Sequence, residues 1–492
     1  MALLPQLNQL WNNLDMTNTS PLDYPFLVSL LLASLLLLLI RRRSSGIKLN
    51  LPPSPPKLPL IGNLHYLGSL PHRSLRELAR KYGHDLMLLH LGQAPTLVVS
   101  SAEMLRQILK SHDSIFSNRP KTTANSILLY GCKDVGFSPY GEYWRQVRKV
   151  SVVELLSMKR VLQFQFVRDQ EVSVMVNRIR KACAIGASIN LSDVFIAVSN
   201  NIVSRCVLGD CYEEENGTSR LGELGRRVTI HLLEFSVGDY FPYMGWIDVV
   251  RGFTGRLKAT FVELDTFFDE VVEEHKARLE NDAGNFQAKD FVDILLLLQK
   301  DGMLEFDLNK NDLKAILVDM FLGGSDTTST TLEWLMAELI KHPNVMKKLQ
   351  EEVRRVVGQK TNIEMNDINK MEYLNCVIKE TLRLHPPAPL LLPRETRKNI
   401  EMGGYHIPAK TRVFINAWAI QRDPRLWDRP EEFIPERFQN NSVDYRSQDL
   451  QFVPFGLGRR GCPGMSFALA STEFVIANVL YWFDWKLPRM VF

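Results

Sequence analysis

A loop close to the end of the chain, residues 454–464, combines a single cysteine with glycines, two arginines and an aromatic residue. Glycines allow the backbone to approach a bulky planar group and to adopt positive φ. We expect a helix to begin after Cys462 and to direct its free N–H groups toward the sulfur, which favours the thiolate. The apolar residues that predict this helix are Phe467, Leu469, Phe474 and Val475.

This composition has two interpretations. A lone cysteine in a glycine-rich turn is most simply a buried structural residue. A cysteine thiolate is also one of the few axial ligands of haem iron, where it favours cleavage of the O–O bond. Arg460 then has a role as well, because arginine forms forked hydrogen bonds to carboxylates such as the haem propionates.

The spacing within the loop favours the second interpretation, because it resembles the haem-binding loop of the cytochrome P-450 superfamily. The residues that fit the pattern F-x-x-G-x-R-x-C-x-G are Phe455, Gly458, Arg460, Cys462 and Gly464. The resemblance implies heme b (iron protoporphyrin IX) as the cofactor, with Cys462 as the axial ligand of the iron. It also places Phe455 and Gly456 against the haem.

Composition limits the class of protein. The chain has 492 residues, of which 45% are hydrophobic and 23% charged, as in a globular protein with a large core. A net charge of +4 is small for this length and gives no indication of nucleic-acid binding. The six cysteines are scattered, which predicts reduced thiols in the cytosol and no disulfide framework.

The N-terminal region predicts a membrane anchor. Residues 21–43 contain an almost wholly apolar run that ends at Arg41, Arg42 and Arg43, with no Lys or Arg before it. This charge distribution predicts a lumenal tail (1–20), an uncleaved single-pass signal anchor and a cytosolic body. The proline-rich segment 44–60 is a stiff linker, and it resembles the hinge of microsomal P-450 proteins, which implies the endoplasmic reticulum membrane.

The remaining chain, residues 61–492, is predicted to be mainly α-helical with a minor β region. Helical patterns cover residues 261–279, 291–299 and 313–342, and the last of these stops at Pro343. Strands are predicted around residues 96–99 and 413–415. The resemblance implies the cytochrome P-450 fold behind a single N-terminal transmembrane helix, with 61–492 as the haem-thiolate catalytic domain.

The longest predicted helix contains Gly323-Gly324-Ser325-Asp326-Thr327-Thr328. Each glycine costs about 1 kcal/mol relative to alanine in a helix. Either the pair permits a helix break or a tight helix crossing, or it opens a groove over the haem. The segment resembles the superfamily signature A/G-G-x-D/E-T-T, which implies that Thr327 and Asp326 manage protons during oxygen cleavage.

Further haem contacts follow from the resemblance. Trp144 and Arg148 are four residues apart and share the face of a short predicted helix. They are either a buried Trp beside a solvated basic face or, as in the family, partners of the haem propionates. Arg394 matches another propionate partner. The neighbouring basic residues are either ordinary surface or part of a docking face for an acidic electron donor.

Two further sets of residues are assigned by the resemblance. Glu380 and Arg383 lie three apart on one predicted helix face, and with Arg437 they resemble the superfamily's buried Glu–Arg–Arg triad, which is structural. An E-x-x-R pair alone is usually an exposed ion pair. The candidates for the substrate pocket, with ordinary core packing as the alternative, are Phe321, Leu322, Gly323 and Leu391.

The motifs together look like those of the plant A-type microsomal group. One feature departs from that group: the sequence ends at Phe492, where a C-terminal strand pair is expected, so we expect a truncated chain. The leading hypothesis is a monooxygenase that oxidises a small lipophilic specialised metabolite of terpenoid, phenylpropanoid or alkaloid type. Its electrons would come from NADPH through NADPH–cytochrome P-450 reductase, with a cytochrome b-type donor as a second source.

Two alternatives remain. One is a non-catalytic membrane haem protein or inactive isoform that results from the C-terminal loss. The other is a haem-thiolate isomerase or dehydratase that needs no reductase. The presence of Thr327 disfavours the latter, because the family branches that do not use molecular oxygen usually lack this residue.

Overall fold

The computed structural model describes residues 28–35, 49–211, 219–281, 288–302, 304, 306–445 and 450–487. The chain divides into two compact units, Met1–Leu51 with Gly404–His406, and Pro52–Gly403 with Ile407–Phe492. In the first unit, residues 28–35 are helical and exposed. The rest of the predicted anchor, with Arg41–Arg43, lies outside the described residues, as do the last residues, 488–492, on which the expected truncation bears.

The second unit contains a four-stranded sheet in the order β1-β2-β6-β3. The strands are β1 (Leu86–Leu91), β2 (Ala94–Val99), β3 (Arg394–Glu395) and β6 (Arg412–Ile415), and two further short strands are β4 (Ile400–Met402) and β5 (Tyr405–Ile407). β2 pairs with β1 in antiparallel and with β6 in parallel orientation, with Val98 opposite Phe414. The two predicted strands are therefore confirmed and are direct neighbours.

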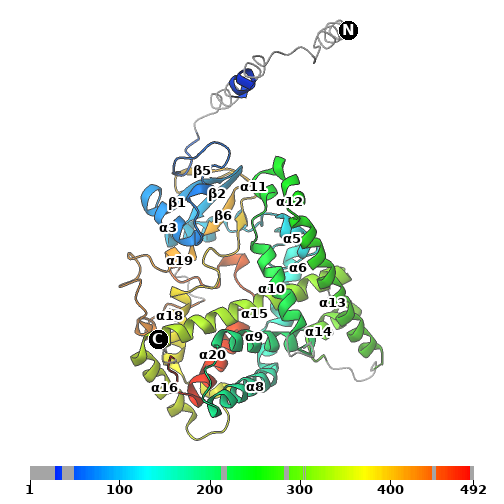
Figure 1. The fold of residues 1–492 in the computed structure, drawn as a ribbon, viewed down its shortest axis with the longest axis vertical. Helices are drawn as coiled ribbons and strands as arrows, with labels where there is room; N and C mark the ends of the chain where they lie inside the picture. The colour runs from blue at the N-terminus through cyan, green and yellow to red at the C-terminus, as the bar shows by residue number, and fades with distance from the viewer. Residues whose placement is uncertain are drawn as a thin grey trace. The chain divides into compact units, whose positions relative to one another are not determined.

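Helices make up most of the second unit (Figure 1). Those before residue 260 are α3 (Pro71–Tyr82), α4 (Ala102–Gln107), α5 (Thr123–Leu128), α6 (Glu142–Val150), α7 (Met158–Gln163), α8 (Gln165–Ala184), α9 (Leu191–Leu208), α10 (Arg220–Leu233), α11 (Val237–Tyr240), α12 (Trp246–Val250) and α13 (Phe253–Asn281). The later ones are α14 (Phe291–Lys300), α15 (Lys310–Lys341), α16 (Pro343–Val357), α17 (Met365–Ile368), α18 (Glu372–Leu384), α19 (Ala417–Ile420) and α20 (Met465–Trp482).

Short 3-10 and π-helical turns connect these elements. The 3-10 turns are Leu64–Tyr66, Pro242–Met244, Pro435–Phe438 and Gly458–Arg460, and the π turns are Ile108–His112 and Ser151–Leu155. The predicted helices within 261–279, 291–299 and 313–342 are confirmed as α13, α14 and α15. The mainly helical fold with a minor sheet is confirmed as well.

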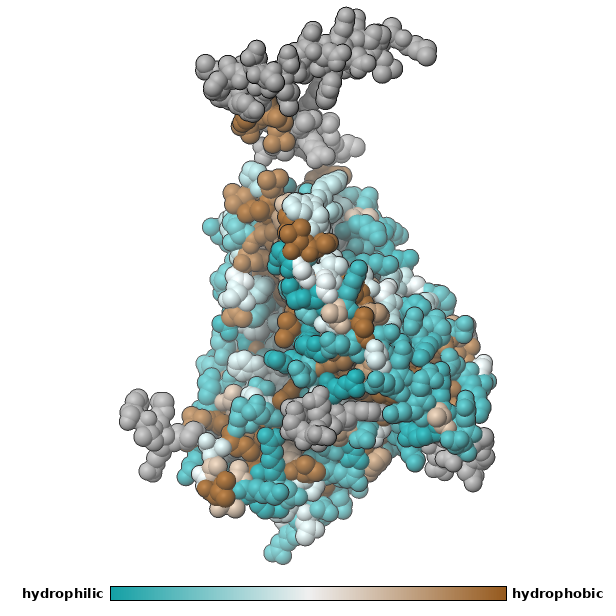
Figure 2. Space-filling model, turned by 45° about the vertical axis from the view of Figure 1, so that its right-hand side comes forward, coloured by the Kyte–Doolittle hydropathy of each residue, from teal (hydrophilic) through white to brown (hydrophobic). Residues whose placement is uncertain are grey.

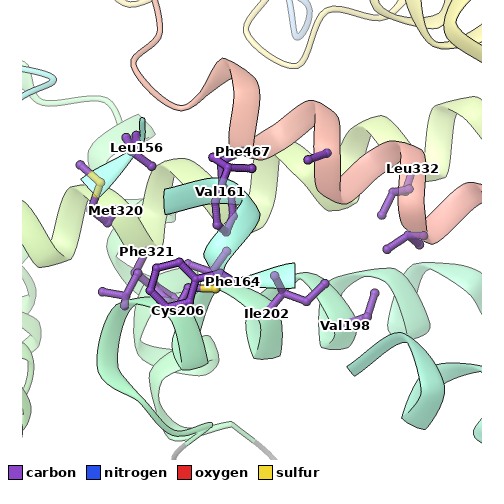
Figure 3. Packing of buried hydrophobic residues seen from close by; sticks show 14 of the residues in the cluster. Leu156, Val161, Phe164, Val198, Ile202, Cys206, Met320, Phe321, Leu332 and Phe467 are labelled. Carbon is purple, nitrogen blue, oxygen red and sulfur yellow. The ribbon is translucent and has the colours of Figure 1, made fainter. Parts of the chain in front are cut away.

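Helix α15 runs through the centre of the second unit and packs against α9, α18 and α20 (Figure 1). Asn309 caps its N-terminus by accepting hydrogen bonds from the backbone N–H groups of Asn311 and Asp312. It ends at Lys341 because Pro343 lacks the N–H that a continued helix requires. Its buried apolar residues belong to one large cluster, part of which is shown in Figure 3.

Hydrophobic residues on the face shown in Figure 2 are scattered among polar ones, as expected where the main apolar faces are turned inward. Two described helices, α9 and α20, are long and apolar enough to cross a membrane. More than half of each is buried inside the unit, however, as in the core helices of a globular domain.

The two adjacent glycines of α15 have different surroundings. A Cβ added at Gly324 would lie 3.0 Å from Cγ2 of Val203 on α9, so this glycine permits a tight helix crossing. A Cβ added at Gly323 would meet no atom of the described residues within 4 Å. The helix is unbroken through both positions, so the predicted opening of the helix itself is not observed. The tight crossing that we considered as the alternative is present at Gly324.

The Glu380 carboxylate is fully buried in α18 and lies at the centre of a hydrogen-bond network. It accepts hydrogen bonds from Nε and Nη2 of Arg383 at 2.7 and 2.8 Å. It also accepts one from Nε of Arg437 at 3.0 Å and one from the backbone N–H of Ile434 at 2.8 Å. The three residues assigned to a structural triad are therefore in direct contact.

Gln421 extends this network toward the cysteine loop. Its backbone carbonyl accepts a hydrogen bond from Nη1 of Arg383 at 2.9 Å. Its side-chain carbonyl accepts one at 2.9 Å from the backbone N–H of Val453, which directly precedes the cysteine loop, residues 454–464. Fixing Arg383 thus also fixes the chain that enters this loop.

The two glycines give a matched stability test. We expect Gly323→Ala to increase the free energy of unfolding by up to about 1 kcal/mol, because alanine is the better helix former and the Cβ meets no obstacle. Gly324→Ala should be about 1–3 kcal/mol less favourable than Gly323→Ala, because its Cβ overpacks the crossing with α9. Urea unfolding of both variants measures the difference. The added change Val203→Ala should remove it, and equal effects of the two substitutions would contradict this account.

The Glu380 network gives a second test. Glu380→Gln should lower the free energy of unfolding by about 3–5 kcal/mol, because it leaves the buried Arg383 charge without its counter-ion. The matched control is Glu77→Gln, which removes the exposed ion pair with Arg80 and should cost about 0–1 kcal/mol. Chemical denaturation measures both changes, and a Glu380→Gln variant as stable as the control would refute the structural role of the triad.

Candidate active site

Cys462 lies in the turn that leads into α20. Its backbone N–H donates a hydrogen bond to the carbonyl of Phe455 at 2.8 Å, which closes the loop on itself. Two glycines in the loop adopt left-handed backbone conformations, Gly456 with φ 70° and Gly458 with φ 61°. At Gly458 a Cβ would lie 2.6 Å from a methyl carbon of Leu109, so both conformation and space require glycine there.

The side chain of Cys462 is exposed, so its sulfur is accessible to a ligand. Burial raises the pKa of Cys462, although the backbone N–H of Gly464 and the charge of Arg148 act to lower it. The predicted effect of the helix N-terminus on the pKa is present in the hydrogen bond from Gly464, but desolvation outweighs it in the protein without a metal. Binding to a metal ion would deprotonate the thiol outright.

The arginines predicted to hold propionates are gathered beside this loop. Arg460 is buried, and its guanidinium lies 4.1 Å from the centroid of the Trp144 ring. It donates hydrogen bonds to the backbone carbonyls of Ser117, Val135 and Ser138. Nε1 of Trp144 donates to the same Val135 carbonyl at 3.1 Å, so the two side chains are positioned by one segment of the chain.

Arg148 and Arg394 bind the cysteine loop itself. Nη2 of Arg148 donates to the carbonyl of Gly461 at 2.6 Å, and Nη2 of Arg394 donates to the carbonyl of Leu457 at 2.7 Å. Nη1 of Arg394 is buried and has no hydrogen-bond partner among the described residues. Its nearest carboxylate is that of Asp113, at 3.6 Å.

A fourth arginine, Arg119, also lies here and was not predicted from the sequence. It is buried and donates hydrogen bonds to the carbonyls of Gly136, Leu392 and Pro393. Burial, together with the charges of Arg460 and Arg394, lowers its pKa. No motif surrounds Arg119, and only the tertiary structure brings it to the cluster.

The donor set around Cys462 fits a haem. Burial, with the charge of Arg394 next in importance, lowers the pKa of Arg460 to about 9. Burial lowers that of Arg394 to about 10. These shifts have desolvation as their main cause, and a bound anion would favour the charged form of both guanidinium groups. The orphaned Nη1 of Arg394 points to the same need for an anion. The two propionates of a haem would supply it, and the thiol of Cys462 is a suitable iron ligand.

Asp319 connects α15 to this cluster and was not singled out in the sequence. One of its carboxylate oxygens accepts hydrogen bonds from the backbone N–H groups of Val135 and Gly136, at 2.5 and 2.8 Å. Val135 is the residue whose carbonyl holds both Trp144 and Arg460. Burial raises the pKa of Asp319 to about 6. Burial also raises the pKa of Asp134, and the charge of Asp319 is the second cause of that rise.

The residues predicted to handle protons lie on α15. Gly323 and Thr327 are exposed, whereas most of this helix is buried, and the Thr327 hydroxyl donates to the Gly323 carbonyl at 2.6 Å. Asp326 is turned toward α10, where it accepts a hydrogen bond from the hydroxyl of Thr229 at 3.0 Å. α15 packs against α20, the helix that follows Cys462.

The four substrate-pocket candidates have different environments. Phe321 is buried among the core side chains shown in Figure 3, and its ring is the group that a Cβ at Gly225 of α10 would strike. Core packing, our alternative for this residue, therefore describes it better than a place in the pocket. Leu322 and Leu391 are half-buried, and Gly323 faces open space. Leu391 has a φ of 52°, uncommon for a leucine.

Comparison with known proteins identifies relatives along nearly the whole chain. The family model for cytochrome P450 matches residues 52–491. A phenylacetaldehyde oxime monooxygenase of Prunus mume is 53% identical over 495 residues, which cover 99% of this chain and 93% of the relative. Cytochrome P450 71A1 of Persea americana is 55% identical, with 87% and 85% covered. Desmethylyatein synthase of Sinopodophyllum hexandrum is 47% identical, with 91% and 89% covered.

A solved structure agrees with the fold. A zebrafish cytochrome P450 determined with abiraterone superposes with a TM-score of 0.70 at 27% identity, covering 84% of this chain and 91% of that one. The family-model match and the plant relatives confirm the resemblance to cytochrome P450 that was inferred from the cysteine loop. The chain therefore belongs to the cytochrome P450 family and is a haem-dependent monooxygenase of its plant A-type group.

Proposed function

We propose that this chain is a haem-thiolate monooxygenase that inserts one oxygen atom from O2 into a small lipophilic specialised metabolite. The observation that carries the proposal is the position of Cys462, an accessible cysteine in a loop that Arg148 and the buried Arg394 bind directly. An iron ligand and partners for two propionates are thus available on neighbouring parts of one site.

In this proposal Cys462 is the axial ligand, and the propionates are held by Arg460, Arg394, Arg148 and Trp144. Arg394 offers an unused N–H group for such a bond. Trp144 contributes a ring face that supports the Arg460 guanidinium, and its indole N–H, bound to the Val135 carbonyl, fixes the position of the ring. Arg119 adds positive charge from the side of Leu392 and Pro393.

The bound haem would supply activation and cleavage of O2, for which the thiolate provides electron density. The residues of α15 would manage the protons. The Thr327 hydroxyl donates its proton to the Gly323 carbonyl, so its oxygen is free to accept a hydrogen bond and thereby to position a proton donor beside it. Asp326, hydrogen-bonded to Thr229 of α10, is the proposed group that takes up protons from the solvent side.

The substrate class is proposed from the relatives. They include a phenylacetaldehyde oxime monooxygenase, a desmethylyatein synthase and a norfluorocurarine oxidase, the last being 45% identical. These names point to aromatic and nitrogen-containing plant metabolites. The half-buried apolar side chains of Leu322 and Leu391 suit such a substrate, because they offer shape and few polar anchors.

Electron supply and location complete the proposal. Electrons would come from NADPH through a flavoprotein reductase, with a cytochrome b-type donor as a second source. Residues 21–43 would anchor the chain in the endoplasmic reticulum membrane, with the catalytic domain in the cytosol and residues 44–60 as the linker. The supporting features are the apolar run and the three arginines that follow it.

Cys462→Ser tests the iron ligand. The reduced, carbon-monoxide-bound wild-type protein should show the strongly red-shifted Soret band of thiolate ligation, and the variant should lose it, because serine provides no thiolate. The matched control is Cys183→Ser, which removes an exposed cysteine of α8 and should leave the band unchanged. A wild-type protein that binds haem without the red-shifted band would refute Cys462 as the ligand.

Thr327→Val tests proton handling. In an assay with a reductase and a substrate that the wild-type enzyme converts, the rate of product formation should fall roughly 100-fold. This is the lower end of what a positioned proton donor contributes to the rate. NADPH consumption should fall less than this, since electron delivery does not require the hydroxyl. Thr327→Ser keeps the hydroxyl and should retain most of the coupling. If Thr327→Val formed product at the wild-type rate, the chemistry would be of the isomerase or dehydratase type.

A further inference from the structure

A second group of metal-ligating side chains lies where α13 and α14 meet. It consists of His275 near the end of α13, Asp290 at the N-cap of α14, and Asp293 in the first turn of α14. All three are buried, with exposed fractions of 2%, 0% and 1% for their side chains. One ligand atom from each lies within 4.8 Å of the others. None of these residues belongs to the site around Cys462.

Both aspartates are held by the backbone at the start of α14. One carboxylate oxygen of Asp290 accepts the backbone N–H of Asp293 at 2.9 Å, as an N-cap residue does. One oxygen of Asp293 accepts the backbone N–H of Lys289 at 2.9 Å. In each case the second oxygen remains for the cluster. The two carboxylates are thus oriented in advance, as metal ligands usually are.

His275 is oriented in the same way. Its Nδ1 lies 2.7 Å from the backbone carbonyl of Val271, so Nδ1 must carry a hydrogen. This is the arrangement that prepares Nε2 of a histidine for metal binding. Nε2 lies 3.1 Å from Oδ2 of Asp290. In the neutral imidazole both of these atoms are acceptors, so a positive species has to join them.

That species is either a proton or a metal ion, and Asp293 distinguishes the two. Oδ1 of Asp293 is buried and has no hydrogen-bond partner among the described residues. A proton on His275 satisfies Nε2 and Asp290 but leaves this oxygen unpaired, at a cost expected for a buried acceptor. A metal ion satisfies all three atoms together. The nearest cation, Nη2 of Arg278, is 3.6 Å from Asp293 and 3.7 Å from Asp290, beyond hydrogen-bond distance.

Gly209, at the end of α9, makes room for the Asp290 carboxylate. It adopts a left-handed conformation with φ 81°, and a Cβ there would lie 2.6 Å from Oδ2 of Asp290. Any other residue would displace the oxygen that faces His275. Arg278 lies on the open side of the cluster with 48% of its side chain exposed, so it is able to move aside when a cation enters.

We propose that His275, Asp290 and Asp293 form a binding site for one divalent metal ion of the zinc class, with water as a further ligand. The donor set of one imidazole nitrogen and two carboxylate oxygens suits zinc. The site joins the end of α13 to the start of α14, so its role is structural. It is independent of the haem chemistry proposed above.

The proposal predicts a specific pH dependence. Zinc binds only the neutral imidazole, so protons compete with the metal for Nε2 of His275. The affinity for zinc should therefore fall as the pH is lowered, with release of a proton when zinc binds to the protonated site.

Zinc binding by the full-length, haem-loaded protein tests the proposal. After equilibrium dialysis against zinc chloride, zinc and iron are measured by mass spectrometry at about pH 8 and about pH 6. At the higher pH we expect the wild-type protein to retain one zinc equivalent more than either His275→Gln or Asp293→Asn. At the lower pH the wild-type protein should retain less zinc than it does at the higher pH. His65→Gln, which removes an exposed histidine elsewhere, should retain the wild-type amount.

Two further measurements decide the outcome. The Soret spectrum of each variant establishes that it folds around the haem, and Asp293→Asn preserves side-chain shape if His275→Gln fails to fold. Addition of zinc should raise the midpoint temperature of thermal unfolding in the wild-type protein only. Equal zinc content in folded wild-type and Asp293→Asn protein would overturn the proposal and identify the cluster as a protonated His275–Asp290 ion pair.

Discussion

The buried carboxylate of Glu380 neutralises the charges of Arg383 and Arg437, and the structure of the second unit depends on this pairing. It accepts four hydrogen bonds while fully buried, two from Arg383 and one each from Arg437 and the backbone of Ile434. Since a buried guanidinium without a counter-ion is costly, this carboxylate allows Arg383 to bind backbone carbonyls between residues 421 and 432. Through Gln421 the same network fixes the entry to the cysteine loop. The loop that contains Cys462, the proposed iron ligand, is thus positioned by charges that have no proposed part in the chemistry.

The other side of the cysteine loop has the opposite charge balance. Three buried arginines, Arg119, Arg394 and Arg460, and the half-buried Arg148 lie near the cysteine loop, and burial is the first cause of the lowered pKa of each. Their hydrogen bonds go mostly to backbone carbonyls, which hold the guanidinium groups in place without removing their charge. The protein therefore carries an electrostatic cost that a dianionic cofactor would relieve. Haem binding and stability of this region are linked for that reason.

Helix α15 connects the two sides. At Gly324 it approaches α9 closely, at Gly323 it leaves space, and at Asp319 it holds the loop that positions Trp144 and Arg460. The helix remains continuous, so the space beside Thr327 comes from a missing side chain and not from a break in the backbone. Because the helix is unbroken, its buried part fixes the position of the exposed Thr327 more rigidly than an opened helix would.

The sequence by itself determined the family and predicted the iron ligand and the residues around it, because fixed spacings such as those around Cys462 and Glu380 reflect local geometry. Helix periods and turn residues likewise predicted α13, α14, α15 and the neighbouring strands β2 and β6. Tertiary structure decided what depends on distant neighbours. It placed Phe321 in the core, added Arg119 to the cation cluster, and raised the pKa of Cys462 through burial that outweighs a local helix terminus. It also brought His275 to Asp290 across 15 residues. Burial and long-range contact are properties of the packed chain, and no local pattern encodes them.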